Sequence, residues 1–262
     1  MNTMNTEFIR SELLNGEILK DIIYFEEIDS TNEYAKKNNT ESDTIIITTH
    51  QTKGKGRFNR QWKTSYSKDL TFSIVKSFKI RIDEIHLVNF YSSYNLLTTL
   101  KNYFSKTTGL EFSLKWPNDV LLNRKKIAGL LLDVKDLNSE IKKFIIGIGI
   151  NCNGYFIPDE LKIKATSLLK ETNIEVIRED LLVLFVRSFY ENLFLLNNKN
   201  ELMQRWKENS GTMKSKVSFR KLEDDKEQAV TVIDIDPDGG LIVKTDDGKI
   251  SKYYSGEISL SY

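Results

Sequence analysis

Residues 114–134 read LKWPNDVLLNRKKIAGLLLDV, and the apolar runs in this stretch predict neighbouring strands. FSLKW at 112–116 and DVLLN at 119–123 are separated by a Pro-Asn turn, and KIAGLLLDV at 126–134 forms a third run. Short apolar runs bounded by turn residues are typical of buried strands. The stretch therefore predicts a sheet whose turns carry polar and charged side chains.

The polar residues of this stretch allow two interpretations. A hairpin with a polar tip accounts for Asn118 and Asp119 but not readily for Trp116. Alternatively, charged groups gather at the end of the sheet to form a site. Lys126 stands directly before IAGLLLDV and would be partly buried in a central strand, where a cation requires an anionic partner.

The rest of the chain adds strands and helices to this sheet. TIIITT at 44–49, DLTFSIV at 69–75 and FIIGIGINC at 144–152 read as strands, because they are rich in β-branched residues. Apolar residues recur at helical spacing over residues 85–104 and 178–196, and we expect a long helix over each range.

The pattern changes towards the C-terminus. From Ser215 onward, VSFRKL, AVTVIDI, GLIVKT and ISKYY alternate like short antiparallel strands, with DPDGG and DDGK as turns. This predicts a small β-barrel of about 50 residues, near the lower size limit for independent folding. We expect one domain over residues 1–210 and a second over residues 211–262.

The composition of the chain excludes several classes of protein. The 262 residues include 38 Lys and Arg and 37 Asp and Glu, so the net charge of +1 gives no general attraction to nucleic acid. The single cysteine, Cys152, excludes an internal disulfide framework, and two histidines leave little for a zinc site. No apolar run reaches membrane-spanning length, and the N-terminus lacks the pattern of a signal peptide. We expect a cytoplasmic protein with no membrane contact.

The stretch GKGRFNRQW begins at Gly54 and combines glycines, cations and a tryptophan. Gly54 and Gly56 allow a close approach of the backbone to a ligand, and Arg57 and Arg60 can neutralise phosphate oxygens. The stretch fits neither the P-loop nor the dinucleotide-binding glycine pattern. An exposed basic loop would explain the charges, but it leaves Trp62 unexplained.

The stretch DSTNEYAKK has a strong structural interpretation. Ser30 followed by Glu33 is a capping box, so Ser30 starts a short helix. Alternatively, Ser30, Thr31 and Asn32 converge on a small polar ligand at that helix start. On this stretch alone the cap is preferred.

Glycine alternates with isoleucine in GIGIN, which ends at Asn151. Glycine inside a strand indicates close approach by a ligand or another backbone, although tight core packing explains it equally well. Four segments thus place polar groups near glycine, which would suit one pocket for a nucleoside phosphate and a small polar molecule.

The chain resembles the biotin protein ligases in the order and spacing of motifs over nearly its whole length. KWPND followed by KIAG is highly specific, and the glycine-arginine loop is the signature of the family. The motifs are STN at 30–32, QTKGKGRFNRQW at 51–62, KWPNDVL at 115–121, KKIAGLLLDV at 125–134, GIGIN at 147–151, ATSL at 165–168 and GEISL at 256–260.

The resemblance implies a fold and an activity. The fold is an α+β catalytic domain with a mixed sheet, of the class II synthetase-like biotin/lipoate ligase type, followed by an SH3-like β-barrel. The activity is the activation of biotin with ATP and Mg²⁺ to biotinyl-5'-AMP, and the transfer of biotin to one lysine of a biotin carboxyl carrier protein. Because the mixed anhydride hydrolyses easily, the loop at residues 53–61 is expected to order over it and exclude water.

The resemblance also implies roles for individual residues. Lys126 bridges the biotin carboxylate and the α-phosphate, Arg57 supplies a second cation, and Asp119 orients or deprotonates the incoming lysine. Biotin-binding positions implied by the family are Ser30, Thr31, Asn32, Gln51, Gly54, Lys55, Gly56, Arg57, Lys126 and Gly129. ATP-binding positions are Arg57, Arg60, Trp62, Asn118, Asp119, Lys126 and Asn151, with Trp62 helping to form the adenine site. The loop departs from the common family pattern GRGRRGR-x-W at Lys55, Phe58 and Asn59.

The expected partners follow from the same resemblance. Repressor-type members carry a DNA-binding domain ahead of the STN motif, but only 29 residues precede Ser30, so we expect a ligase without specific DNA binding. Many relatives dimerise through the catalytic sheet, and the resemblance allows a homodimer. Two alternatives remain: a lipoate ligase, although the chain lacks the GGG triplet of that type, and a nucleotide-binding or RNA-binding module.

Overall fold

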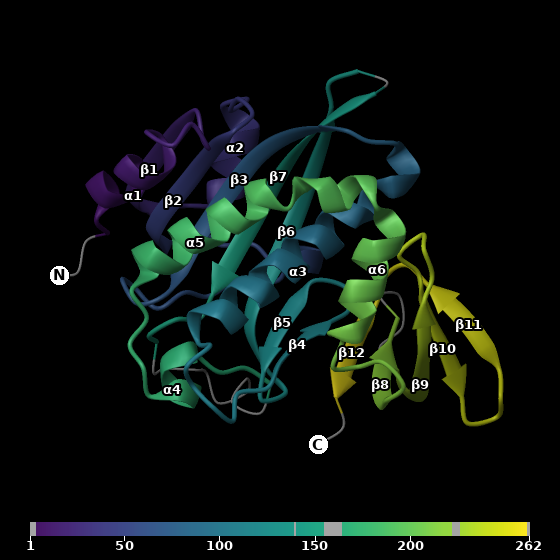
Figure 1. Cartoon of the computed structure of the whole chain (residues 1–262). Coiled ribbons are helices and arrows are strands. Elements are labelled where there is room, and N and C mark those ends of the chain that lie inside the picture. The colour runs from purple at the N-terminus through teal and green to yellow at the C-terminus, as the bar shows by residue number, and fades with distance from the viewer. Residues whose placement is uncertain (1–3, 139, 155–163, 222–225, 261–262) are drawn as a thin grey trace.

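The computed structural model describes residues 4–138, 140–154, 164–221 and 226–260. Two sheets dominate it, and helices cover the larger one (Figure 1). The elements up to the long central helix are α1 (Thr6–Leu13), β1 (Asp21–Ile28), α2 (Thr31–Lys37), β2 (Thr44–Gln51), η1 (Arg57–Asn59), β3 (Leu70–Lys79), η2 (Ile82–Glu84) and α3 (His86–Tyr103). Next come β4 (Phe112–Lys115), β5 (Asp119–Leu122), β6 (Lys125–Asp136), β7 (Ile141–Ile150), α4 (Leu168–Thr172), α5 (Arg178–Glu191), η4 (Leu193–Asn197) and α6 (Lys199–Glu208). The C-terminal strands are β8 (Lys216–Arg220), β9 (Glu227–Ile235), β10 (Leu241–Thr245), β11 (Ile250–Tyr253) and β12 (Glu257–Leu260).

The larger sheet is mixed and has seven strands in the order β1-β2-β3-β7-β6-β5-β4. Strands β1 and β2 are parallel, and every other neighbouring pair is antiparallel. The three strands predicted from the opening motif, β4, β5 and β6, lie side by side as consecutive antiparallel neighbours. The α+β class with a mixed sheet is confirmed.

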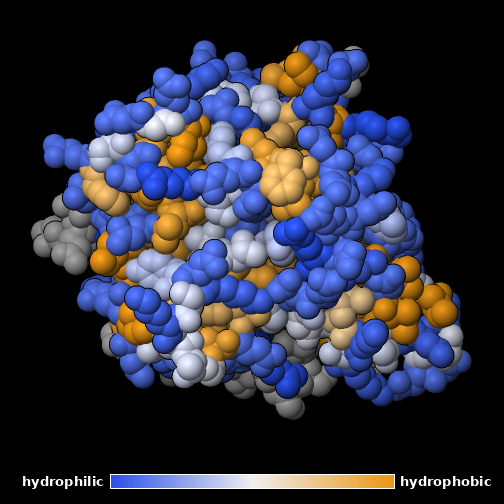
Figure 2. Space-filling view, in the orientation of Figure 1, coloured by the Kyte–Doolittle hydropathy of each residue, from blue (hydrophilic) through white to orange (hydrophobic). Residues whose placement is uncertain are grey.

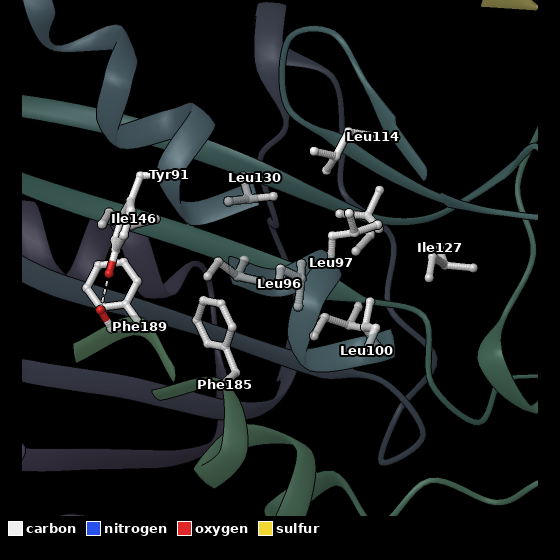
Figure 3. Packing of buried hydrophobic residues seen from close by; sticks show 14 of the residues in the cluster. Tyr91, Leu96, Leu97, Leu100, Leu114, Ile127, Leu130, Ile146, Phe185 and Phe189 are labelled. Carbon is white, nitrogen blue, oxygen red and sulfur yellow. Dashed lines mark hydrogen bonds between the residues drawn. The ribbon is translucent and has the colours of Figure 1, made fainter. Parts of the chain in front are cut away.

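One face of this sheet carries the main hydrophobic core. Helices α3 and α5 pack across it, and Figure 3 shows their side chains meeting the strands. The Tyr91 hydroxyl donates to the Phe189 carbonyl, and Phe185 lies against Phe72 with ring centres 5.7 Å apart. Each fully buried large apolar side chain stabilises the fold by about 1.5–3 kcal/mol. This layer makes the sheet a rigid platform.

The opposite face of the sheet is only partly covered. Helix α2 packs on β2, β3 and β7. Its contacts form a small apolar cluster of Ala35, Ile46, Val75 and Ile145. The helix spans seven residues, so the rest of this face is open to other groups.

The C-terminal strands form an antiparallel sheet in the order β11-β10-β9-β8-β12. The expected small β domain is therefore present, but the described residues show no pairing of β11 with β12 that would close a barrel. Trp116 joins this sheet to the catalytic part: its buried indole N–H donates to the Gly239 carbonyl at 3.1 Å. Lys207 pairs with Asp234 at 2.7 Å across the same junction. Trp116 thus has a structural role at this junction. The interpretation of its segment as a hairpin with a polar tip had left this residue unexplained.

The predicted long helix over residues 178–196 is shorter than expected. Helix α5 ends at Glu191, and residues 193–197 form a separate 3-10 turn. The side chain of Asn192 explains the end, because its amide donates to the Ser188 carbonyl at 2.9 Å and to Asn95 Oδ1 at 3.0 Å. The apolar pattern continues through this break, so periodicity alone does not detect it.

The molecular face seen in Figure 2 is mostly hydrophilic, with apolar side chains scattered among charged ones. Such scattering is ordinary for a folded protein surface. Within the described residues, no helix combines the length and apolar character needed to span a bilayer.

Candidate active site

Small residues line the centre of the sheet face on which α2 lies. Thr71 of β3 pairs with Gly149 of β7, which in turn pairs with Gly129 of β6. Two residues further along β3, Ser73 pairs with Gly147. Cross-strand partners project from the same face of a sheet. The face therefore carries two short rows, which we name the Thr71 row (Thr71, Gly149, Gly129) and the Ser73 row (Ser73, Gly147).

Gly149 and Gly147 lack side chains, so they leave room for side chains from outside the sheet. A Cβ added to Gly149 would lie 2.3 Å from the Trp62 ring, and one added to Gly147 would lie 2.3 Å from Asn32 Oδ1. Neither distance is compatible with a real side chain. Trp62 thus rests on the Thr71 row, and Asn32 rests on the Ser73 row.

The start of α2 supplies a polar cluster above the Ser73 row. Ser30 caps the helix, because its Oγ accepts from the Glu33 N–H at 3.4 Å, so the capping interpretation is confirmed. Gln51 Oε1 accepts from the Thr31 N–H at 2.8 Å and from the Thr31 hydroxyl at 3.2 Å. The cap and the polar cluster occupy the same helix start, so the two interpretations of this stretch are compatible.

Asn32 is held by groups that the sequence reasoning missed. Ser73 Oγ lies 2.6 Å from Asn32 Oδ1 and 2.6 Å from Thr31 Oγ1. The Asn32 amide donates to Asp133 Oδ2 at 2.8 Å. The strict alternation of LTFSI at 70–74, which places Thr71 and Ser73 on one face, was the available signal.

Charged residues from the opening motif form the other end of the site. Asp119 Oδ1 lies 2.6 Å from Lys126 Nζ, and Asp119 Oδ2 lies 3.1 Å from Lys115 Nζ. Burial raises the pKa of the Asp119 carboxyl, but the two ammonium groups outweigh burial and hold the pKa below its ordinary value of 3.8. Lys126 also lies 5.4 Å from the centre of the Trp62 ring. The anionic partner expected for Lys126 is therefore Asp119.

The glycine-rich loop folds back on itself beside this end. The Gly56 N–H donates to the Arg60 carbonyl at 2.7 Å, and Phe58 adopts the left-handed conformation with φ 56°. Lys55 Nζ pairs with Glu33 Oε1 of α2 at 3.2 Å. A Cβ on Gly54 would meet the Trp62 carbonyl at 2.5 Å, so glycine is required there for packing within the loop.

A cavity of about 720 Å³ connects the polar cluster, the Thr71 row and the charged end. Of the residues predicted from the sequence, those in its wall are Ser30, Thr31, Asn32, Gln51, Lys55, Gly56, Arg57, Arg60, Trp62, Asn118, Asp119, Lys126, Gly129 and Asn151. Gly54 is the one predicted position that is not among the described residues lining the cavity. Asn118 donates its amide to the Leu130 carbonyl, and Asn151 donates to the Thr166 carbonyl at 3.0 Å, so both amides also fix the neighbouring backbone.

Polar atoms without partners concentrate at this cavity. Within the described part of the chain, the buried side-chain atoms that lack a hydrogen bond are His50 Nδ1, Trp62 Nε1, Thr64 Oγ1 and Thr71 Oγ1. All of these residues line the cavity. An unpaired buried donor or acceptor costs about 1–3 kcal/mol. The arrangement indicates a site for a ligand with polar atoms of its own.

Comparison with known proteins agrees with this arrangement. Residues 24–151 match the model of the biotin/lipoate A/B protein ligase family, and residues 217–261 match the biotin protein ligase C-terminal domain. The bifunctional ligase/repressor BirA of Bacillus subtilis is 26% identical over 248 residues, covering 91% of this chain and 74% of that protein. BirA of Escherichia coli is 25% identical over 237 residues, covering 89% and 72%.

Solved structures show the same likeness. The biotin protein ligase from Aquifex aeolicus in complex with biotin and ATP superposes with a TM-score of 0.75 at 28% identity, covering 92% of this chain and 98% of that one. The apo structure of the same protein superposes with a TM-score of 0.73 at 27% identity, covering 93% of this chain and 100% of that one. The chain therefore carries a domain of the biotin/lipoate A/B protein ligase family and a biotin protein ligase C-terminal domain, and it is a ligase.

Proposed function

We propose that the protein activates biotin with ATP, forming biotinyl-5'-AMP and pyrophosphate, and then transfers biotin to one lysine of a biotin carboxyl carrier protein. The observation that carries the proposal is the single cavity that joins the amide-hydroxyl cluster to the Lys126–Asp119 pair. A ligand with a polar ring at one end and a carboxylate at the other fits this layout. The complex of the Aquifex aeolicus relative with biotin and ATP supports it.

The polar cluster binds the ureido ring of biotin. That ring presents N–H donors and a carbonyl acceptor, and Ser30, Thr31 and Gln51 offer hydroxyl and amide groups of both kinds. Hydrogen bonds between Thr31 and Gln51, and from the Glu33 N–H to Ser30, hold these side chains in position before the ligand arrives. Pre-ordering reduces the entropy lost on binding.

The charged end carries out the activation. A carboxylate oxygen of biotin attacks the α-phosphorus of ATP, and the bond from that phosphorus to the pyrophosphate oxygen breaks. Negative charge crowds together in this step, so fixed cations lower the barrier. Lys126 bridges the carboxylate and the α-phosphate, Arg57 and Arg60 assist from the loop, and Trp62 provides a flat wall beside them.

Asp119 acts in the transfer step. The amine of the acceptor lysine attacks the activated carbonyl carbon, the bond to AMP breaks, and the amine loses a proton. The lowered pKa of Asp119 makes its carboxylate a weak proton acceptor, which favours an orienting role over general base catalysis. It also positions Lys126 through their short ion pair.

The described residues do not build a cage for a metal ion. Among them, no group of three or more His, Cys, Asp or Glu side chains is placed to hold one. Asp119, the carboxylate at the charged end, is already paired with two lysines. In the proposal, Mg²⁺ enters with ATP as the substrate MgATP.

A carrier-labelling assay tests the proposed function. The protein is incubated with MgATP, a biotin carboxyl carrier domain and either biotin or lipoate, and the mass of the carrier is measured. We expect one biotinyl group on the carrier, and none on a carrier whose acceptor lysine is replaced by arginine. Lipoyl transfer without biotinyl transfer would overturn the proposal in favour of a lipoate ligase. The biotin carboxyl carrier partner, the cytoplasmic location and the lack of specific DNA binding stay predictions.

A further inference from the structure

Thr71 carries a buried hydroxyl that the proposed roles do not use. The residue is 5% exposed and lines the cavity, and Thr71 Oγ1 has no hydrogen-bond partner among the described residues. A threonine hydroxyl normally finds a partner when buried. Thr48, its register partner on β2, satisfies its own hydroxyl by donating to the His50 carbonyl at 2.9 Å. Thr71 Oγ1 is thus one of the unpaired polar atoms at the cavity, whereas the hydroxyl of its register partner is paired.

The register of the sheet fixes where this hydroxyl lies. Ser73, on the same face two residues along β3, contacts Thr31 and Asn32 of the polar cluster. Gly149, directly across from Thr71, lies under the Trp62 ring, beside Lys126. Residues two apart in a strand are separated by about 6.5–7 Å. Thr71 thus lies one residue row from the polar cluster, on the way to the charged end.

The order of groups along biotin identifies the atom that reaches this position. The molecule runs from the ureido ring through a fused ring containing a thioether sulfur to an aliphatic tail that ends in the carboxylate. With the ureido ring at the polar cluster and the carboxylate at Lys126, the sulfur-containing ring lies against Thr71, beside the Trp62 ring that covers Gly149. A thioether sulfur accepts hydrogen bonds weakly and donates none.

We propose that Thr71 is a specificity-determining residue, whose hydroxyl donates a hydrogen bond to the ring sulfur of the ligand. The proposal rests on the proposed function, because it takes the ligand to be biotin. It gives the site a means of preferring the thioether ring over an analogue that lacks sulfur. That analogue leaves the Thr71 hydroxyl buried and unpaired, which weakens its binding.

Binding of biotin and desthiobiotin, which lacks the sulfur, tests this inference. Dissociation constants of both ligands are measured by calorimetry for the wild type, Thr71→Val and Thr71→Ser. The valine variant keeps the shape and removes the hydroxyl, so its preference for biotin over desthiobiotin should fall by about 3- to 10-fold. Serine keeps the hydroxyl and should retain most of the preference. Thr71→Ala provides a second variant without the hydroxyl if the valine protein does not fold.

The matched control is Thr48→Val, which removes a threonine hydroxyl from the neighbouring strand outside the cavity wall and should leave the preference unchanged. An equal preference in wild type and Thr71→Val would overturn the role of Thr71, even if both proteins bind biotin. A wild-type protein that binds neither ligand would overturn the proposed function itself, and this inference with it. The ratio of the two constants separates a sulfur contact from general damage, which weakens both ligands alike.

Discussion

At the scale of single residues, the site depends on a buried carboxylate held between two ammonium groups. Lys126 and Asp119 come from neighbouring strands, β6 and β5, so the sheet itself brings them to 2.6 Å. In the proposed function, Lys126 of this pair brings positive charge to the reacting phosphate. Substitutions of Lys126 and Asp119 therefore test the effect on the reaction and the effect on stability separately.

Lys126→Ala should slow biotinyl-AMP formation by on the order of 10²-fold, because it removes a preorganised cation from the α-phosphate. Pyrophosphate release measures the rate, and circular dichroism checks the fold. Lys125→Ala is the matched control, since Lys125 lies 3.7 Å from Glu171 and outside the cavity wall. Wild-type release by a folded Lys126→Ala protein would contradict the assignment.

Asp119→Asn should change the pH dependence of stability. The carboxyl pKa is lower in the folded protein than its ordinary value of 3.8, so the carboxylate stabilises the fold above pH 3.8. That contribution disappears as the pH falls through the lowered pKa. Urea denaturation near neutral pH should show that the variant's free energy of unfolding is lower by about 1–3 kcal/mol. The difference between wild type and variant should narrow below pH 3.8. A gap that is the same at every pH would argue against the paired carboxylate.

The residue-scale features were only partly predictable from the sequence. The need of Lys126 for an anionic partner follows from burial, but its identity requires the register of β5 and β6. Ser73 and Asp133 escaped notice because a polar residue inside a strand has many interpretations without knowledge of which face is open. Trp116 was recognised as unusual, yet its contact with Gly239 depends on how two distant segments pack.

At the scale of elements, the loop at residues 53–61 is the feature most directly linked to the proposed reaction. Its turn is closed by the hydrogen bond from Gly56 to Arg60, and Lys55 ties it to α2. The sequence predicted a glycine-rich loop between two strands, and β2 and β3 confirm its position. The left-handed conformation of Phe58 was not anticipated, because glycine and asparagine are the usual residues there.

Arg57→Gly should let biotinyl-AMP escape from the site. Losing a charge-assisted contact should speed release by about 10-fold or more, and the free anhydride should then label lysines of a bystander protein. Streptavidin blotting of added albumin detects this labelling. Lys53→Gly is the control: it removes a cation from the same loop, but Lys53 pairs with Asp29 outside the cavity wall. Normal retention of the adenylate by Arg57→Gly would exclude a lid role.

At the scale of the whole molecule, the small C-terminal sheet is joined to the catalytic part through Trp116 and Lys207. Alternating strands and turn residues predicted β8 to β11, whereas the short β12 was not anticipated as a strand. Closure into a barrel was expected and is not seen in the described residues. Alternation indicates strands but does not determine whether the two edge strands, here β11 and β12, pair with each other.

Trp116→Phe should loosen this junction. It removes the hydrogen bond from the indole N–H to the Gly239 carbonyl while keeping an aromatic ring. The free energy of unfolding should therefore fall by about 1 kcal/mol. Tyr91→Phe is a closer control, because it removes a buried hydrogen bond to the Phe189 carbonyl between α3 and α5. Both variants should unfold at lower urea concentration, but only Trp116→Phe should speed protease cleavage between residues 209 and 216. Equal cleavage of the two variants would contradict this role.

Isotope exchange tests the central claim, the activation of biotin by ATP, most directly. Labelled pyrophosphate is added to the wild-type protein with MgATP, with and without biotin, and incorporation of label into ATP is measured without any carrier. We predict exchange that requires biotin, is not supported by lipoate and is reduced on the order of 10²-fold by Lys126→Ala. Absence of biotin-dependent exchange by the folded wild-type protein would contradict the account.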